Sequence, residues 1–223
     1  MDKAQKKVTQ LKRYPINTGY FGEGSTYYPK DGRVYSLTWT DKPILIWEDL
    51  NIAGTESQLT LTYKREILLP SVIREGWGIT HDNDYMYISN GSNIIYVVEP
   101  NQDGTALNIV RKITVDVGSR SVYFNEIEMV EDEYIYANNF LTDEIFKFRK
   151  DNGTLIKVWN VEELMAKQRD HVVKLGQGLS YDFGNNVLNG IAYNPVSKTF
   201  FLTGKRWDFM FEVQLYDDEP KKL

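Results

Sequence analysis

One segment of this chain recurs four times, and this repetition limits the possible folds more than any other feature of the sequence. Each copy begins with a polar residue that is followed by glycine or glutamate. An aromatic residue inside a strand-like run lies 10 or 11 positions after this second residue. The second positions of the copies are 52, 50 and 64 residues apart (24 to 76, 76 to 126 and 126 to 190). A period near 50 residues that is made of short strands is typical of β-propeller blades, which have about four strands each.

Between the turn-forming residues, short runs are typical of hairpin strands, for example 34–39, 85–89, 94–98, 134–137 and 144–148. One helix is expected near 161–169, where Asn160 would be the N-cap and Glu163 its capping-box partner. This helix belongs to an insertion at about 160–186, which could cover one end of the propeller channel. We therefore predict an all-β fold: a single β-propeller domain over residues 1–223, with about four blades visible and one short helix.

The polar residues that open the four copies are candidates for a shared site. Equivalent positions in different blades are related by rotation about the central axis, so these side chains would converge at the channel mouth. They are Glu23, Glu75, Asn125 and Asn189. A second set, 14 or 15 residues after the aligned positions, consists of Trp39, Gly91, Phe140 and Lys205. A simpler interpretation is that glycine and asparagine turn the chain into each inner strand; it explains the glycines well, and the acids and aromatic residues less well.

Composition excludes several classes of function. The formal net charge is −5 and the basic residues are scattered, which disfavours a nucleic-acid partner. The sequence has no run of 18 apolar residues, so no membrane-spanning helix is predicted. Residues 1–7 lack the apolar region of a signal peptide. The absence of cysteine excludes disulfides and thiolate zinc sites. We expect no cofactor, although Asp82 and Asp84 resemble part of a calcium loop and leave a structural calcium ion open.

Five blocks of the sequence, taken in order, resemble the plant and bacterial glutaminyl cyclases. They are residues 21–24, 75–82, 125–128, 187–193 and 203–213. The resemblance implies a five-bladed propeller that converts the N-terminal glutamine of peptides and proteins to pyroglutamate and releases ammonia, without a catalytic zinc. It also implies an extracytoplasmic location, by the habit of the family. We expect a monomer with no nucleic-acid or membrane partner.

The resemblance also assigns roles to particular residues. Glu23 matches the proposed acid/base of the family, and Trp77, Asn125 and Lys205 match residues that face the substrate. Phe140 stands where the family has a second tryptophan, so a ring is kept but an indole N–H is lost. Glu75 and Asn189, at the repeated positions, are candidates for a supporting role. In this scheme Glu23 is the catalytic residue, and no residue binds a metal.

The sequence departs from the family at its start. The opening Phe-Thr-Gln-Gly and Glu-Ser-Thr-Gly segments have no match, so about one blade, roughly 40 residues, is expected to be missing. The region around 50–70 is longer than the family pattern and is interpreted as a loop insertion. Three alternatives stay open: a piece of a longer enzyme, a four-bladed variant, and an inactive relative that binds peptides in its channel. A different hydrolase on the same scaffold is a further alternative, because fold does not fix chemistry.

Overall fold

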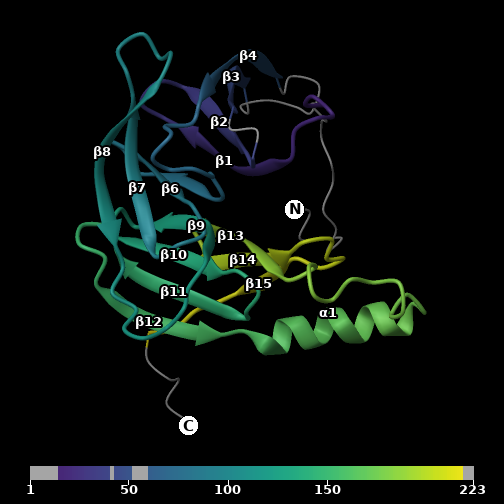
Figure 1. The fold of residues 1–223 in the computed structure, drawn as a ribbon. Helices are drawn as coiled ribbons and strands as arrows, with labels where there is room; N and C mark the ends of the chain where they lie inside the picture. The colour runs from purple at the N-terminus through teal and green to yellow at the C-terminus, as the bar shows by residue number, and fades with distance from the viewer. Residues whose placement is uncertain (1–14, 41–42, 52–59, 218–223) are drawn as a thin grey trace.

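A computed structural model of the protein describes residues 15–40, 43–51 and 60–217. In this part of the chain the strands form four antiparallel sheets, each built from strands in chain order (Figure 1). The first sheet, blade 1, comprises β1 (Gly22–Tyr28), β2 (Arg33–Thr38), β3 (Pro43–Asn51) and β4 (Thr60–Leu68). Blade 2 comprises β5 (Ile79–His81), β6 (Met86–Ser89), β7 (Ile94–Pro100) and β8 (Leu107–Thr114).

The other two sheets follow the same order along the chain. Blade 3 comprises β9 (Phe124–Val130), β10 (Tyr134–Asn139), β11 (Glu144–Arg149) and β12 (Leu155–Asn160). Blade 4 comprises β13 (Leu188–Asn194), β14 (Thr199–Gly204) and β15 (Phe211–Val213). The predicted all-β propeller with four visible blades is therefore confirmed for the described residues. The residues on which the signal-peptide expectation rests, 1–7, lie outside them.

Each pair of neighbouring blades encloses its own hydrophobic core. Tyr28 and Leu37 of blade 1 pack against Ile88 and Tyr96 of blade 2, and all four are at least 96% buried. A second cluster joins blades 2 and 3, and a third joins blade 3 to blade 4 and the helix. Each fully buried side chain of this size contributes about 1.5–3 kcal/mol, so the interfaces between blades hold the fold together.

The inner strands lie so close together that glycine is required between them. A Cβ added to Gly24 would lie 2.9 Å from the Cα of Gly78, and one added to Gly78 would lie 2.3 Å from the carbonyl oxygen of Asn125. The Gly24 N–H also donates to the carbonyl of Trp77 at 2.9 Å. Backbone therefore packs on backbone from blade 1 to blade 3, which leaves no room for side chains at Gly24 and Gly78.

Three inner strands contain a β-bulge at the same place. In blade 1 the residues Glu23 and Gly24 oppose the single residue Leu37, because Gly22 pairs with Thr38 and Ser25 with Ser36. In blade 3 the pair 125–126 opposes residue 138, and in blade 4 the pair 189–190 opposes residue 203. A bulge bends the strand and re-aims its side chains. The repeat seen in the sequence thus marks the points where the inner strands turn side chains toward the channel.

Blade 2 corrects the alignment of the repeat. Gly24 contacts residues 77–79 in the way that Gly78 contacts residues 125–127, so Gly78 is the equivalent of Gly24. The residue equivalent to Glu23 is therefore Trp77, and the sequence alignment, which chose Glu75, was two positions out. The reason is that two neighbouring dipeptides, Glu75-Gly76 and Trp77-Gly78, both end in glycine and both fit the repeat. Only the strand pairing separates them.

The helix α1 (Glu162–Lys174) is longer than predicted. Val161 holds the N-cap position without a side-chain cap, although the Asn160 Oδ1 accepts the N–H of Glu162 at 2.8 Å. The helix continues past 169 because a buried stripe extends along it: Leu164, Met165, Gln168 and Val172. In Figure 1 it runs along the lower edge of the molecule, beside blade 4.

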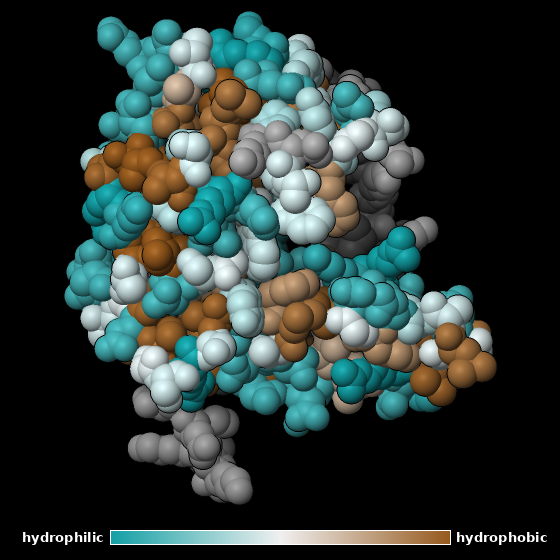
Figure 2. Space-filling model, viewed as in Figure 1, coloured by the Kyte–Doolittle hydropathy of each residue, from teal (hydrophilic) through white to brown (hydrophobic). Residues whose placement is uncertain are grey.

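The outer surface mixes polar and apolar residues, and Figure 2 shows the hydrophobic ones in separate groups among hydrophilic ones. Among the described residues, no helix is both long and apolar enough to cross a membrane. The predicted loop around 50–70 is wrong for residues 60–68, which form β4 and pair with β3. The side chains of Ile44 and Ile67, which are paired there, are buried and explain why this segment is a strand. Residues 52–59 lie outside the described part.

Candidate active site

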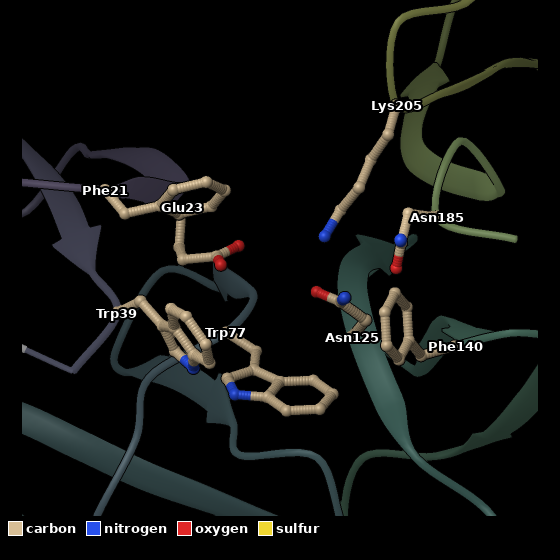
Figure 3. Close-up of a pocket in the computed structure, with 8 residues that line it drawn as sticks. All are labelled: Phe21, Glu23, Trp39, Trp77, Asn125, Phe140, Asn185 and Lys205. Carbon is tan, nitrogen blue, oxygen red and sulfur yellow. The ribbon is translucent and has the colours of Figure 1, made fainter. Parts of the chain in front are cut away.

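A pocket of about 300 Å³ lies where the inner strands of blades 1 to 3 face the loop that follows β14. The side chains that line it come from all four blades and from the insertion (Figure 3). They are Phe21, Glu23, Trp39, Trp77, Asn125, Phe140, Asn185 and Lys205. All five residues predicted to be catalytic or to bind substrate are among them. The structure brings these residues together, and their roles stay predictions.

Glu23 holds the acidic position of the pocket. The bulge of β1 turns its side chain inward, and in Figure 3 its carboxylate and the ammonium group of Lys205 point into the pocket from opposite sides. Burial raises the pKa of Glu23 to about 7, although the positive charge of Lys205 acts in the other direction. The negative charge of Glu75 raises this pKa further. Near neutral pH this carboxyl can therefore both accept and donate a proton.

Glu75 supports two walls of the pocket. Its Oε2 accepts the indole N–H of Trp39 at 2.8 Å and the indole N–H of Trp77 at 3.1 Å. A carboxylate that accepts two N–H groups makes charge-assisted hydrogen bonds, which are stronger than neutral ones. One acid thus fixes the orientation of both indole rings, which lie side by side in Figure 3.

Gly91 and Phe140 also contact the ring of Trp77. A Cβ on Gly91 would lie 2.6 Å from the Trp77 ring, and Gly91 has a positive φ of 73°. The ring of Phe140 meets the Trp77 ring edge-on, with the centroids 5.6 Å apart. Trp77 and Phe140 thus form an aromatic wall of the pocket.

Lys205 is positioned by the loop after β14. Its Nζ lies 4.9 Å from the ring centroid of Phe140 and 6.0 Å from that of Phe21, distances at which a cation and a ring attract each other. The loop is fixed because Trp207 packs on Gly204 and its indole N–H donates to the Asn186 carbonyl at 2.9 Å. The ammonium group is therefore aimed across the pocket toward Glu23.

Two asparagines at bulge positions have unused hydrogen-bonding atoms. Asn125 is 97% buried, and its Oδ1 has no hydrogen-bond partner in the described part of the chain. The same holds for the Oδ1 of Asn189. A buried polar atom without a partner is costly, so an unpaired amide at the wall of a pocket indicates a place for a ligand group. Asn125 lines the pocket described above, and Asn189 lines a neighbouring cavity.

The neighbouring cavity, of about 660 Å³, shares Phe21, Glu23, Asn185 and Lys205 with the first pocket. The insertion between blades 3 and 4 forms part of its wall through Asp182, Asn185 and Asn186. Its charged side chains also include those of Glu126 and Arg206. Glu23 and Lys205 thus line both cavities.

The residues of the calcium-like fragment lie away from this site. Asp82 Oδ1 accepts the N–H groups of Asp84 and Tyr85, and Oδ2 accepts the Tyr87 hydroxyl and the Lys150 ammonium group. These bonds join blade 2 to blade 3 and lower the pKa of Asp82, despite its burial. Within the described residues no group of three or more histidine, aspartate or glutamate side chains is placed to hold a metal ion.

The sequence analysis placed Trp39 in the second repeated set but assigned it no role, and Phe21 stood in an aligned block without being selected. Asn185 and Glu126 were not selected either. Asn185 has no signal, because it lies in an insertion that has no counterpart in the repeat. Glu126 had a signal that was overlooked: it occupies a position at which the other three blades have glycine, namely Gly24, Gly78 and Gly190. A charged residue that replaces a packing glycine points to a use other than packing.

The fold and the site define a β-propeller with an acidic group, an ammonium group and an aromatic wall at one end of its channel. A model of the glutamine cyclotransferase family matches residues 1–215, and the chain belongs to this family.

Two of the known proteins that resemble the chain are glutaminyl cyclases. A glutaminyl-peptide cyclotransferase of Arabidopsis thaliana is 26% identical over 216 residues, which is 96% of this chain. The chain spans 58% of the length of that relative. The crystal structure of the glutaminyl cyclase of Myxococcus xanthus superimposes with a TM-score of 0.67 at 28% identity, over 88% of this chain and 73% of that one.

Proposed function

We propose that this chain cyclises N-terminal glutamine of peptides and proteins to pyroglutamate with release of ammonia. The observation that carries the proposal is Glu23, a carboxyl whose pKa burial raises to about 7, opposite Lys205 in a pocket with an aromatic wall. Membership of the glutamine cyclotransferase family and the names of the two relatives support the same reaction.

The reaction needs one proton to move between two nitrogens. The neutral α-amine attacks the γ-carboxamide carbon, a C–N bond forms, and a tetrahedral intermediate results. Glu23 takes a proton from the attacking nitrogen and gives it to the leaving nitrogen, after which the old C–N bond breaks and ammonia departs. A free α-amine has a pKa of about 7.7–8.0, so a carboxyl with a pKa about 7 is well matched to it. The scheme uses side chains alone and requires no cofactor.

The other pocket residues have roles that follow from their chemistry. Lys205 can stabilise the negative oxygen of the intermediate, and the Oδ1 of Asn125, which lacks a partner, can accept an N–H of the substrate. The walls formed by Trp77 and Phe140 hold the glutamine side chain folded back toward its own amine, which supplies proximity. Glu75 serves indirectly by holding the indoles.

The proposal is tested by incubating the chain with a Gln-initiated dipeptide and measuring ammonia together with the loss of ammonia from the peptide mass. We expect turnover, and we expect Glu23→Gln to lower kcat by about 10²–10⁴-fold, the usual contribution of a general acid/base. The control is Glu163→Gln on an exposed turn of α1, which removes the same charge elsewhere. No turnover by a folded wild-type chain that still binds the dipeptide would favour the non-catalytic, peptide-binding alternative.

A further inference from the structure

We propose that Glu126 is a second carboxyl of the reaction site, a positioning residue that acts through Glu23 by controlling how readily Glu23 takes up a proton. The inference rests on the proposed function above for its catalytic meaning. The physical coupling of the two carboxyl groups is independent of that function. Four observations support it.

The first observation is the place of Glu126 in the blade. It is the second residue of the bulge in β9, a position held by Gly24, Gly78 and Gly190 in the other blades. At Gly24 and Gly78 a side chain would collide with the backbone of the next blade. Blade 3 alone among the four therefore carries a side chain here, and that side chain is an acid.

The second observation is where this side chain lies. Glu126 lines the cavity of about 660 Å³ together with Glu23 and Lys205. The bulge explains this, because 125 and 126 together oppose one residue of β10 and both reach the channel side of the strand. Asn125 then faces the first pocket and Glu126 the second, with Glu23 common to both.

The third observation is that Glu126 has no hydrogen bond or ion pair with the residues that the structure describes. Glu128, two residues further along the same strand, is different. It accepts the N–H of Tyr193 at 2.9 Å and is also hydrogen-bonded to Thr80. Glu128 thus links blades 2, 3 and 4. Glu126 is half-buried at the wall of the cavity and makes no such link between blades, so it has no comparable structural explanation.

The fourth observation is the electrostatic environment. Glu126 is faced by Glu23 from β1, by Glu128 from its own strand and by Lys205 from the loop after β14, and Asp182 and Arg206 line the same cavity. Burial raises the pKa of Glu126 to about 7, the negative charge of Glu23 raises it further, and Lys205 opposes the increase. The coupling of two charges is mutual, so Glu126 must act on Glu23 in the same direction.

Two coupled carboxyls in one cavity do not ionise independently. Near neutral pH such a pair retains one proton, because the second ionisation would place two negative charges close together. The negative charge of Glu126 holds the proton affinity of Glu23 near that of the substrate amine. The proton that Glu23 takes from the attacking nitrogen still leaves with the ammonia, so the pair ends each turnover in its starting state.

The direct test is a carboxyl NMR titration of protein labelled with ¹³C at the glutamate Cδ. We expect Glu126→Gln to lower the titration midpoint of Glu23 by on the order of half to one pH unit, since a like charge is removed. By reciprocity, Glu23→Gln should lower the midpoint of Glu126 by the same amount. Glu163→Gln on the exposed surface of α1 is the control, because it removes the same charge away from both cavities and should leave Glu23 unmoved. Glu126→Asp keeps the charge and should restore part of the shift.

The kinetic readout is the pH profile of kcat/KM on a Gln-initiated dipeptide. In Glu126→Gln its acidic limb should move to lower pH, and kcat/KM at neutral pH should fall by about 3–10-fold. Coupled titration without any turnover would remove the proposed function but keep the carboxyl pair. Turnover in a protein whose Glu23 midpoint is the same with and without Glu126 would overturn the inference. If Glu126→Gln does not fold, the titration midpoint of Glu126 in Glu23→Gln tests the coupling instead, and an unchanged midpoint would overturn the inference.

Discussion

At the scale of single residues, the contact of Gly91 with Trp77 predicts that a substitution at Gly91 weakens substrate binding beyond its effect on stability. In Gly91→Ala the new methyl group would lie 2.6 Å from the indole and force it out of place. Gly32→Ala is the control, because Gly32 has nearly the same φ, 72°, but no atom within 4 Å of a Cβ. Both variants should lose about 1 kcal/mol of unfolding free energy to backbone strain. Only Gly91→Ala should also raise KM, by about 10-fold, in steady-state assays; equal KM values would contradict this.

The residues of the site could be found from the sequence only in part. The rotational logic of a repeat placed Glu23, Asn125, Phe140 and Lys205 at one end of a channel, and they do line one pocket. The same logic chose Glu75 for the position that Trp77 occupies, because the sequence does not reveal which of two dipeptides forms the bulge. The hydrogen bonds from both indoles to Glu75 depend on side-chain directions, which no spacing encodes.

At the scale of elements, α1 fixes the loop that carries Lys205. Gln168, buried on the inner side of the helix, donates to Asp208 Oδ2 at 3.3 Å and accepts the Asp208 N–H at 3.2 Å. Gln168→Ala should cost about 1–2 kcal/mol of unfolding free energy for the two lost bonds, and lower kcat/KM by about 3–10-fold as Lys205 loses its orientation. Lys167→Ala, an exposed neighbour, serves as control. A change in stability without a change in kcat/KM would show that the loop is held by other contacts.

The strands were easier to predict than the helix boundaries. Short apolar runs between turn residues define hairpins locally, so each of the five runs predicted above falls on an observed strand. The position at which α1 ends cannot be predicted from the local sequence alone. Its last buried residue is Val172, and Gln168, a polar residue, interrupts the apolar pattern between Met165 and Val172. The strand β4 was missed for a similar reason, since the register of its pairing with β3 decides which side chains are buried.

At the scale of the whole molecule, the channel contains three acids with raised pKa values. Burial is the main cause in Glu23, Glu126 and Glu128, each with a pKa about 7. These three groups therefore bind more protons in the folded protein than in the unfolded chain between about pH 4.5 and 7. Stability contributed by these groups is complete below the ordinary glutamate pKa and is lost as the pH rises through the folded value. The propeller should accordingly be less stable at pH 8 than at pH 5.

Glu128 allows this expectation to be tested at a residue that lines neither cavity. Glu128→Gln keeps an acceptor for the Tyr193 N–H but cannot ionise, so it should be more stable than the wild type at pH 8, by on the order of 2–3 kcal/mol. At pH 5, where the wild-type carboxyl is already protonated, the two proteins should have similar unfolding free energies. The measurement is urea unfolding at pH 5, 6, 7 and 8, with Glu163→Gln on the exposed surface of α1 as the control for lost charge. An unchanged slope of stability against pH in Glu128→Gln would mean that Glu128 is ionised at little cost in the folded channel, and that its bonds to blades 2 and 4 outweigh its burial.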